Sequence, residues 1–168
     1  MKETNQVTIE RVFEAPLEKV WEAWTKPEEI KKWWGPEGFS APEIEIDFRV
    51  GGKYHYMMRG PIEEGGEEMD MWSGGEFKEI VPHEKIVATD HFSNEAGDTV
   101  DPATFGMSED FPKESDMTIL FQRQGDSTKL SIIYEGVSAK AYEAYKQSGM
   151  HEGWQSSLNK LEKALTEN

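Results

Sequence analysis

The sequence contains no cysteine among its 168 residues. A chain without cysteine has no disulfide framework, no thiol nucleophile and no cysteine-based metal site. No segment is long and apolar enough to span a bilayer, and residues 1–10 lack the apolar core of a signal peptide. We therefore expect a soluble, cytoplasmic protein that has no membrane partner.

Positive charge is scarce, because 18 lysines and arginines stand against 33 aspartates and glutamates, for a net charge of −15. A field of this sign repels phosphate backbones, so nucleic acids are disfavoured as partners. We interpret the acidity as a contribution to solubility. The length is typical of one domain, and we expect residues 1–168 to fold as a single domain.

Sequence signatures of catalysis are missing as well. No pair among the four histidines has the helical spacing of metal ligands, and no carboxylate triad accompanies them. There is no Gly-x-Ser-x-Gly elbow, no phosphate-binding loop and no dinucleotide fingerprint. We predict no metal, no cofactor and no catalytic residue, and we interpret the glycine pairs at 51–52, 65–66 and 74–75 as turns or bulges.

What the sequence does contain is one long amphipathic segment near its C-terminal end, residues 150–165. Its large apolar residues follow one another at steps of four, four, three and four, which is the period of one helix face. They are Met150, Trp154, Leu158, Leu161 and Leu165. At a rise of about 1.5 Å per residue, this helix is about 24 Å long and can cross a whole small domain.

A strand, two short helices and six further strands precede this helix in the predicted order. The first strand covers residues 4–13, Pro16 opens the first helix, and Gly35-Pro36 ends the second. The alternation of apolar and polar residues predicts the other strands at 44–48, 53–59, 69–80, 85–92, 117–122 and 130–134. Most connections between these strands are short, which implies antiparallel pairing.

The predicted fold class is therefore α+β, with a seven-stranded curved antiparallel sheet wrapped around the long C-terminal helix. A gap between the two layers, lined by apolar side chains, is the default ligand site. Residues 94–114 show no periodicity and form an unusually long loop. Two interpretations of this loop stay open: a lid or mouth of the gap, or an excursion without function.

Several segments of the chain resemble one known family. They include IERVF at 9–13, VWEAWT at 20–25, WWGP at 33–36, DFRVGG at 47–52 and the Gly153-Trp154 pair. This combination resembles the activator of heat-shock-protein-90 ATPase homologue family, within the START-like, birch-pollen-allergen-like SRPBCC superfamily. The resemblance implies a helix-grip fold with a cavity and no fixed chemistry. It also implies a chaperone partner and a role in the stress response. The eukaryotic chaperone activators carry an additional N-terminal domain, which we do not expect here.

Aromatic residues and methionines indicate what the gap would bind, since the chain has six tryptophans and eight methionines. Methionine fills irregular spaces around varied ligands, and aromatic rings supply flat apolar surface. Plain core packing is the alternative for each of these residues. The predicted ligand-pocket residues are Trp34, Tyr56, Met58, Trp72, His91, Phe105, Tyr134 and Trp154.

Three polar residues are further candidates for the same pocket: His55, Asp70 and Asp90. A carboxylate in apolar surroundings has a raised pKa and can act as an acid or base, and a histidine can orient a ligand or move a proton. We favour the alternative that the two carboxylates turn outward or pair with Arg59 or another cation. For the histidines we favour a surface or internally hydrogen-bonded position.

The leading functional hypothesis is non-catalytic binding of a small hydrophobic or aromatic molecule. The alternative is a co-chaperone-like interaction module, which rests on the resemblance alone. A weaker alternative is a cyclase- or hydrolase-like enzyme, which requires His55, His91 or Asp90 to converge in one cavity within hydrogen-bond reach. A monomer and a homodimer both remain open.

Overall fold

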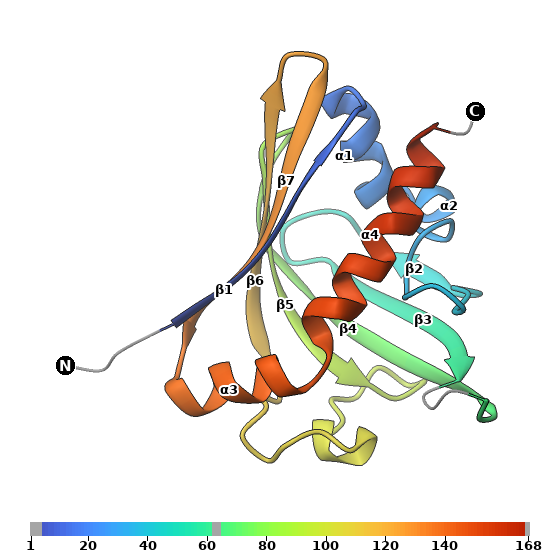
Figure 1. The fold of residues 1–168 in the computed structure, drawn as a ribbon, viewed down its shortest axis with the longest axis vertical. Helices are drawn as coiled ribbons and strands as arrows, with labels where there is room; N and C mark the ends of the chain where they lie inside the picture. Colours follow the sequence, from blue (N-terminus) through green and yellow to red (C-terminus); the bar gives the residue numbers. More distant parts are fainter. Residues whose placement is uncertain (1–4, 62–64, 167–168) are drawn as a thin grey trace.

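The structure is a computed structural model that describes residues 5–61 and 65–166. The predicted strands and helices appear in the predicted order, with two further helices, one in the long loop and one before the C-terminal helix (Figure 1). The strands are β1 (Asn5–Phe13), β2 (Ile44–Ile46), β3 (Lys53–Pro61), β4 (Glu68–Val81), β5 (Lys85–Ser93), β6 (Ser115–Gln124) and β7 (Ser127–Val137). The helices are α1 (Leu17–Thr25), α2 (Pro27–Ile30), the 3-10 helix η1 (Pro102–Phe105), α3 (Ala139–Gln147) and α4 (Met150–Thr166).

The seven strands form one antiparallel sheet in the order β1-β7-β6-β5-β4-β3-β2. Alternate side chains of the central strands point to the inner face, as the period of two requires. On β6 and β7 the buried inner residues are Met117, Ile119, Phe121, Leu130, Ile132 and Tyr134. The predicted α+β architecture with a long C-terminal helix is confirmed.

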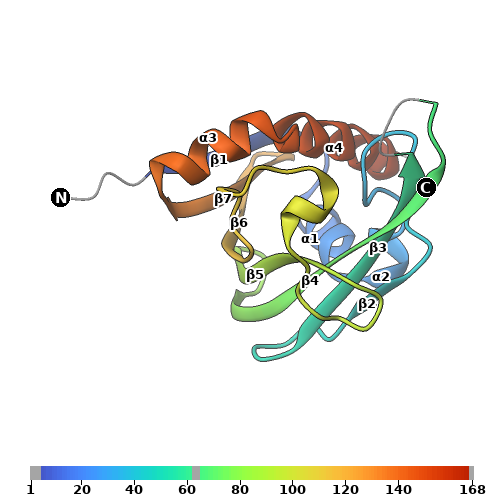
Figure 2. The same ribbon diagram turned by 90° about the horizontal axis from the view of Figure 1, so that it is seen from below.

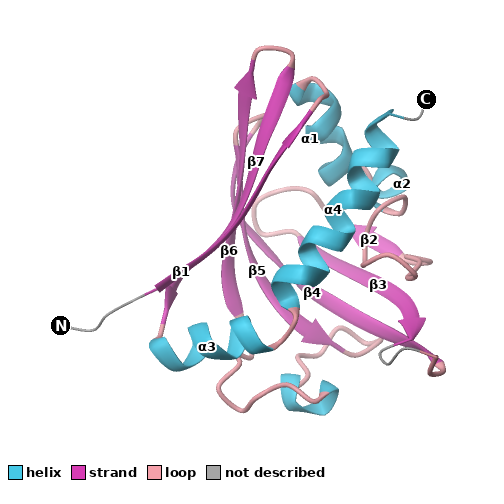
Figure 3. Ribbon diagram, in the orientation of Figure 1, coloured by secondary structure: helices cyan, strands magenta, loops and turns pink. Residues whose placement is uncertain are grey.

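Helix α4 lies across the concave side of the curved sheet, with α1 and α2 near its C-terminal half and α3 at its other end (Figures 1 and 2). Leu158 and Leu161 on its inner face are completely buried. At the sheet edge, Arg11 of β1 donates hydrogen bonds of 2.7 Å to Asn159 Oδ1 and to Gln155 Oε1. Since β1 is an edge strand of the sheet (Figure 3), these contacts join the helix to the sheet edge.

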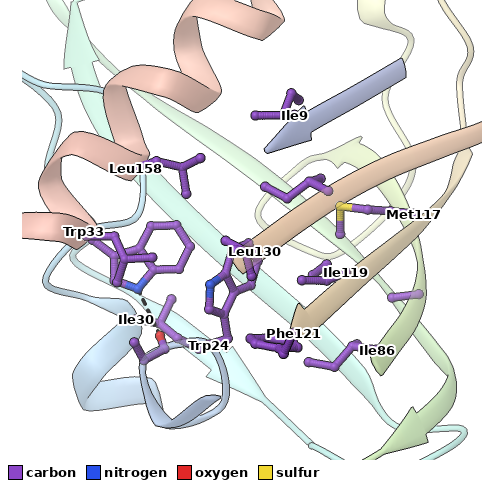
Figure 4. Packing of buried hydrophobic residues seen from close by; sticks show 14 of the residues in the cluster. Ile9, Trp24, Ile30, Trp33, Ile86, Met117, Ile119, Phe121, Leu130 and Leu158 are labelled. Atoms are coloured by element: carbon purple, nitrogen blue, oxygen red, sulfur yellow. Dashed lines mark hydrogen bonds between the residues drawn. The ribbon is translucent and has the colours of Figure 1, made fainter. Parts of the chain in front are cut away.

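Close packing fills the end of the molecule that α1 and α2 cover. Trp33 is completely buried, and its indole nitrogen donates a 2.9 Å hydrogen bond to the carbonyl of Ala23 (Figure 4). The ring of Trp24 lies 4.7 Å from that of Trp33 and 6.4 Å from that of Phe121, between centroids. Helix and sheet therefore interlock at this end.

One local prediction is wrong, the bulge at Gly74-Gly75. Pairing of β4 with β3 is continuous there, and the irregularity in β4 lies between Phe77 and Glu79, on the side of β5. Glycine is needed at position 75 because a Cβ atom would lie 1.9 Å from the carbonyl oxygen of Thr89. The predicted strand start at residue 4 and the loop residues 62–64 lie outside the described residues.

None of the helices in the described ranges is both long and apolar enough to cross a membrane. Within the same ranges, no cluster of three or more histidine, aspartate or glutamate side chains is arranged to hold a metal ion.

The packing of α4 leads to a stability prediction. Leu161→Ala should lower the free energy of unfolding by about 2–5 kcal/mol, because the truncation leaves a cavity under a completely buried position. Urea denaturation followed by circular dichroism measures this change. The neighbouring exposed Glu162→Ala should stay within about 0.5 kcal/mol of the wild type. Equal effects of the two substitutions would contradict the described orientation of α4.

Candidate functional site

A cavity of about 250 Å³ lies between the sheet and the N-terminal half of α4. It is the end of the interlayer space that α1 and α2 do not fill. Its walls come from β3, β4, β5, β6, β7, α3 and α4, together with three connecting segments at residues 34–36, 107–112 and 148–149. The lining residues are Trp34, Gly35, Pro36, Met58, Met71, Ser73, Asp90, His91, Phe92, Met107, Phe111, Pro112, Ser115, Tyr134, Tyr145, Ser148, Gly149, Met150, Gly153, Trp154 and Ser157.

Trp154 forms the boundary between the packed end and the cavity. Its ring stacks on Trp24 at 6.0 Å and 21°, and it meets the ring of Trp34 edge-on at 5.7 Å and 87°. Both geometries are favoured for aromatic pairs. Trp24, Trp34 and Trp154 therefore form one cluster of rings. Trp24 belongs to the packed core, while Trp34 and Trp154 also line the cavity.

Lys160 holds one wall in place from α4. Its Nζ donates to the carbonyl oxygens of Gly35 at 3.1 Å and Phe39 at 2.9 Å, and contacts that of Trp34 at 3.4 Å. Partial burial lowers the pKa of this ammonium group, and Glu37 opposes the shift. The loop after α2 is thereby fastened to the same helix that forms the opposite wall.

Asp90 is the one carboxylate among the described residues that line the cavity. The hydroxyl of Tyr134 donates to its Oδ2 at 3.2 Å. The hydroxyl of Tyr54 lies 3.1 Å from its Oδ1 and 2.8 Å from the carbonyl oxygen of Thr89, so its one proton is shared between two acceptors. Gly75 makes room for this arrangement, since a Cβ there would lie 2.8 Å from Cε1 of Tyr54. Asp90 is half-buried, and its remaining accessible surface faces the cavity.

The surroundings of Asp90 disfavour its charged form. Burial raises the pKa of its carboxyl, and hydrogen bonds from Tyr54 and Tyr134 together with nearby His91 offset part of the rise. The pKa values of both tyrosines are raised well above their usual range, first by burial and then by the Asp90 charge. A buried carboxyl and two neutral phenols therefore form one polar group in an otherwise largely apolar cavity.

A second polar pair lies on the α3 side of the cavity. The hydroxyls of Ser115 and Tyr145 are hydrogen-bonded to each other. Burial raises the pKa of Tyr145 to about 12, with the hydrogen bond from Ser115 opposing the shift. The Tyr145 and Tyr134 rings lie 5.4 Å apart, between centroids.

The long loop contributes directly to the cavity. Met107, Phe111 and Pro112 from this loop line it, as does Gly149 in the turn between α3 and α4. Gly149 has a φ of +81°, a conformation that glycine adopts at little cost. The position of these loop residues supports the first of the two interpretations of residues 94–114, in which the loop forms a lid or mouth of the cavity.

The predicted pocket residues divide into two groups. Six of them line the cavity: Trp34, Met58, Asp90, His91, Tyr134 and Trp154. Tyr56 is buried behind the wall, with its ring 4.9 Å from that of Trp34. Phe105 lies behind the lining and packs on Phe92 at 5.3 Å.

His55, Trp72 and Asp70 lie outside the cavity. The rings of His55 and Trp72 stack at 4.3 Å and 17°, and His55 Nε2 lies 2.9 Å from Ser93 Oγ. Asp70 accepts a 2.7 Å hydrogen bond from Nε of Arg59, the pairing that we favour from the sequence. Alternation along β3 and β4 puts these side chains on the face opposite to that of Tyr54.

The favoured outward orientation of Asp90 is wrong. Pairing with β4 skips Thr89 and Asp90, but the register is the same on both sides of this gap, and Asp90 pairs with Ser115 of β6. Its side chain therefore stays on the inner face between two tyrosines.

Sequence reasoning also leaves Tyr145, Ser115 and Phe111 out of the pocket. Ser115 shares the parity of Met117 at the start of β6, so strand alternation could have found it. Phe111 lies in the long loop without periodicity, and Tyr145 reaches the cavity because the chain reversal at Gly149 brings α3 against it.

The raised pKa of Asp90 leads to a prediction about pH. The folded protein holds the Asp90 proton more tightly than the unfolded chain does, so this residue lowers stability as pH rises from the usual aspartate range through the raised pKa. We expect the unfolding free energy of the wild type, measured relative to Asp90→Asn, to fall over that interval and then level off. Urea denaturation at a series of pH values measures the difference.

Asp70→Asn is the matched control for this measurement. The Arg59 guanidinium lowers the pKa of Asp70, so stability relative to Asp70→Asn should change in the opposite direction and rise with pH. A pH-independent difference for Asp90→Asn, or the same sign for both variants, would contradict the described surroundings of Asp90.

Comparison with known proteins places this fold in a large group of solved structures. A protein from Chromobacterium violaceum is 28% identical, with a TM-score of 0.71 over 98% of this chain and 99% of the other. A Mycobacterium smegmatis protein is 25% identical, with a TM-score of 0.77 over 97% and 91%. The AHSA1 protein of Silicibacter pomeroyi is 20% identical and shares the fold, with a TM-score of 0.68 over 96% and 97%.

No curated protein matches the chain. A protein-family model described as "Activator of Hsp90 ATPase homolog 1-like protein" matches residues 14–166, from the end of β1 through α4. This range includes all residues that line the cavity. The chain therefore belongs to the family of Activator of Hsp90 ATPase homolog 1-like proteins.

Proposed function

We propose that this protein binds a small hydrophobic or aromatic molecule in the cavity between the sheet and α4, without transforming it. The observation that carries the proposal is the cavity itself, an unfilled volume of about 250 Å³ behind the tryptophan boundary. Protein interiors are close-packed, so a space of this size inside the fold is a ligand-site candidate. At about 30 Å³ per molecule, it has room for roughly eight waters, or for one compact organic molecule of one or two rings.

The lining supports an apolar occupant. Trp34, Phe92, Phe111 and Trp154 offer ring surfaces, and four methionines (Met58, Met71, Met107 and Met150) line the cavity beside them. Burial of apolar ligand surface against such walls contributes about 25 cal/mol per Å². The flexible methionine side chains allow the walls to adjust to the shape of the occupant.

The arrangement of polar groups supports binding without chemistry. The weaker enzyme hypothesis needs His55, His91 or Asp90 to converge in one cavity. His55 instead lies with Trp72 and Ser93 on the opposite sheet face. Nδ1 of His91 lies 3.0 Å from the backbone carbonyl oxygen of Phe92, within hydrogen-bond distance.

Contact with a chaperone is a second candidate function, favoured by the description of the family. It is compatible with a ligand in the cavity, since a partner would bind the outer surface. We also propose, as the sequence predicts, a cytoplasmic location and a single domain.

A filled-cavity variant tests the ligand proposal. Gly153 lines the cavity from within α4, and a Cβ atom at this position would meet no heavy atom within 4 Å. Gly153→Leu should weaken ligand binding at least about tenfold, because the added side chain occupies the ligand volume. Tryptophan fluorescence and native mass spectrometry against a library of small aromatic compounds measure binding.

The matched control is Gly153→Ala, which adds only one methyl group and should retain binding. Both substitutions replace a helical glycine, so neither should lower the melting temperature, and each should gain about 0.5–1 kcal/mol of helix stability. Absence of any bound compound in the wild type, or equal binding by Gly153→Leu, would remove the ligand proposal.

The chaperone candidate predicts an increase in the ATPase rate of the Hsp90-type chaperone from the same source when this protein is added at tens of micromolar. Pull-down from lysate with the wild-type protein should then recover that chaperone. An unchanged ATPase rate across the titration would eliminate this candidate and would leave the ligand proposal unaffected.

A further inference from the structure

The charge of the cavity indicates which apolar molecules it accepts. Asp90 is its one carboxyl group, and no lysine or arginine is found among the described lining residues. His91 is also a lining residue, but its pairing with Gly74 puts its side chain on the opposite face of the sheet, on the side of His55. An ionised Asp90 therefore has no fixed cation next to it inside the cavity.

The hydrogen-bond donors around Asp90 are also too few to satisfy both of its carboxylate oxygens. The Tyr54 hydroxyl carries a single proton but lies 2.8 Å from the carbonyl oxygen of Thr89 and 3.1 Å from Asp90 Oδ1. One proton serves both acceptors, and the shorter contact favours Thr89. Only Tyr134 then gives Asp90 a donor of its own, at 3.2 Å. A carboxylate with two oxygens can accept about four hydrogen bonds, so acceptor capacity remains on the side that faces the cavity.

Aromatic walls surround the same space. Trp34, Trp154 and Tyr134 line the cavity together with Asp90. A positive charge close to an aromatic face is attracted by the ring quadrupole, most strongly for tryptophan. A site that combines one unpaired carboxylate with several aromatic rings matches the chemistry of an organic ammonium group attached to an apolar body.

We propose that the cavity selects small aromatic or aliphatic amines, with the ammonium group donating to Asp90 and the apolar body lying against Trp34 and Trp154. This inference rests on the proposed ligand-binding function and adds the chemical class of the ligand. Asp90 lacks a compensating positive charge and a further hydrogen-bond donor, and the ammonium group supplies both. Carboxylate ligands are excluded by repulsion from Asp90 and disfavoured by the net charge of −15.

Three probes of similar size and different charge test the inference: 2-phenylethylamine, propylbenzene and 3-phenylpropanoate. Titration of the wild-type protein at pH 8, monitored by NMR chemical shifts, gives the three dissociation constants. We expect the amine to bind at least about tenfold tighter than propylbenzene, the range for a hydrogen bond to a charged group. The carboxylate should bind the weakest of the three.

Asp90→Asn removes the charge while preserving the size of the side chain. In this variant the ratio of amine to propylbenzene affinity should fall toward one. The wild-type comparison decides the question by itself, so the test does not depend on the variant folding.

The outcomes separate the two proposals. If propylbenzene or 3-phenylpropanoate binds the wild type as well as the amine does, the selectivity for amines is overturned and the ligand-binding function stands. A preference for the amine that persists undiminished in folded Asp90→Asn also overturns the role of Asp90. If none of the probes binds at millimolar concentration, and the aromatic library gives no bound compound either, the ligand-binding function fails and the amine selectivity fails with it.

Discussion

Contact between α4 and the concave side of the sheet is complete at one end and interrupted at the other, and the site depends on that difference. Near α1 and α2, Leu158, Leu161 and Trp33 are fully buried and the layers interlock. Beyond Trp154 the same helix carries Gly153 and Met150, and the layers enclose a cavity. The packed end supplies the hydrophobic stabilisation that lets the other end stay open, because burial of apolar side chains drives folding.

Asp90 shows what this arrangement costs. A buried carboxyl without a cation lowers stability, and the tyrosines that contact it offset only part of the penalty. Glycine at position 75 is part of the same arrangement, since any side chain there would meet the backbone of Thr89 and the Tyr54 ring. Polar groups that are expensive in the folded state are typical of sites whose partner arrives from outside.

Membership of the family accounts for the fold, whereas the side chains that line the cavity account for what the site can bind. The family covers nearly the whole fold, from residue 14 to residue 166, and brings with it the name of a chaperone activator. The selectivity that we propose for the site depends on a few side chains, chiefly Asp90 and the aromatic residues around it. Because function resides in sites that a fold carries, relatives with the same sheet and helix can hold different molecules.

The sequence alone determined the order of elements, the seven strands and the apolar face of α4, because these follow from local periodicity and turn residues. It also marked Trp34, Tyr134 and Trp154, since large aromatic residues in a two-layer fold have few places to lie. Only the tertiary structure decided that Asp90 faces inward while His55 faces outward. Strand alternation relates neighbours to one another, but the register and the position of the bulge choose which face is buried. Tyr145 and the mouth of the cavity likewise depended on a chain reversal whose direction is set by packing between distant segments.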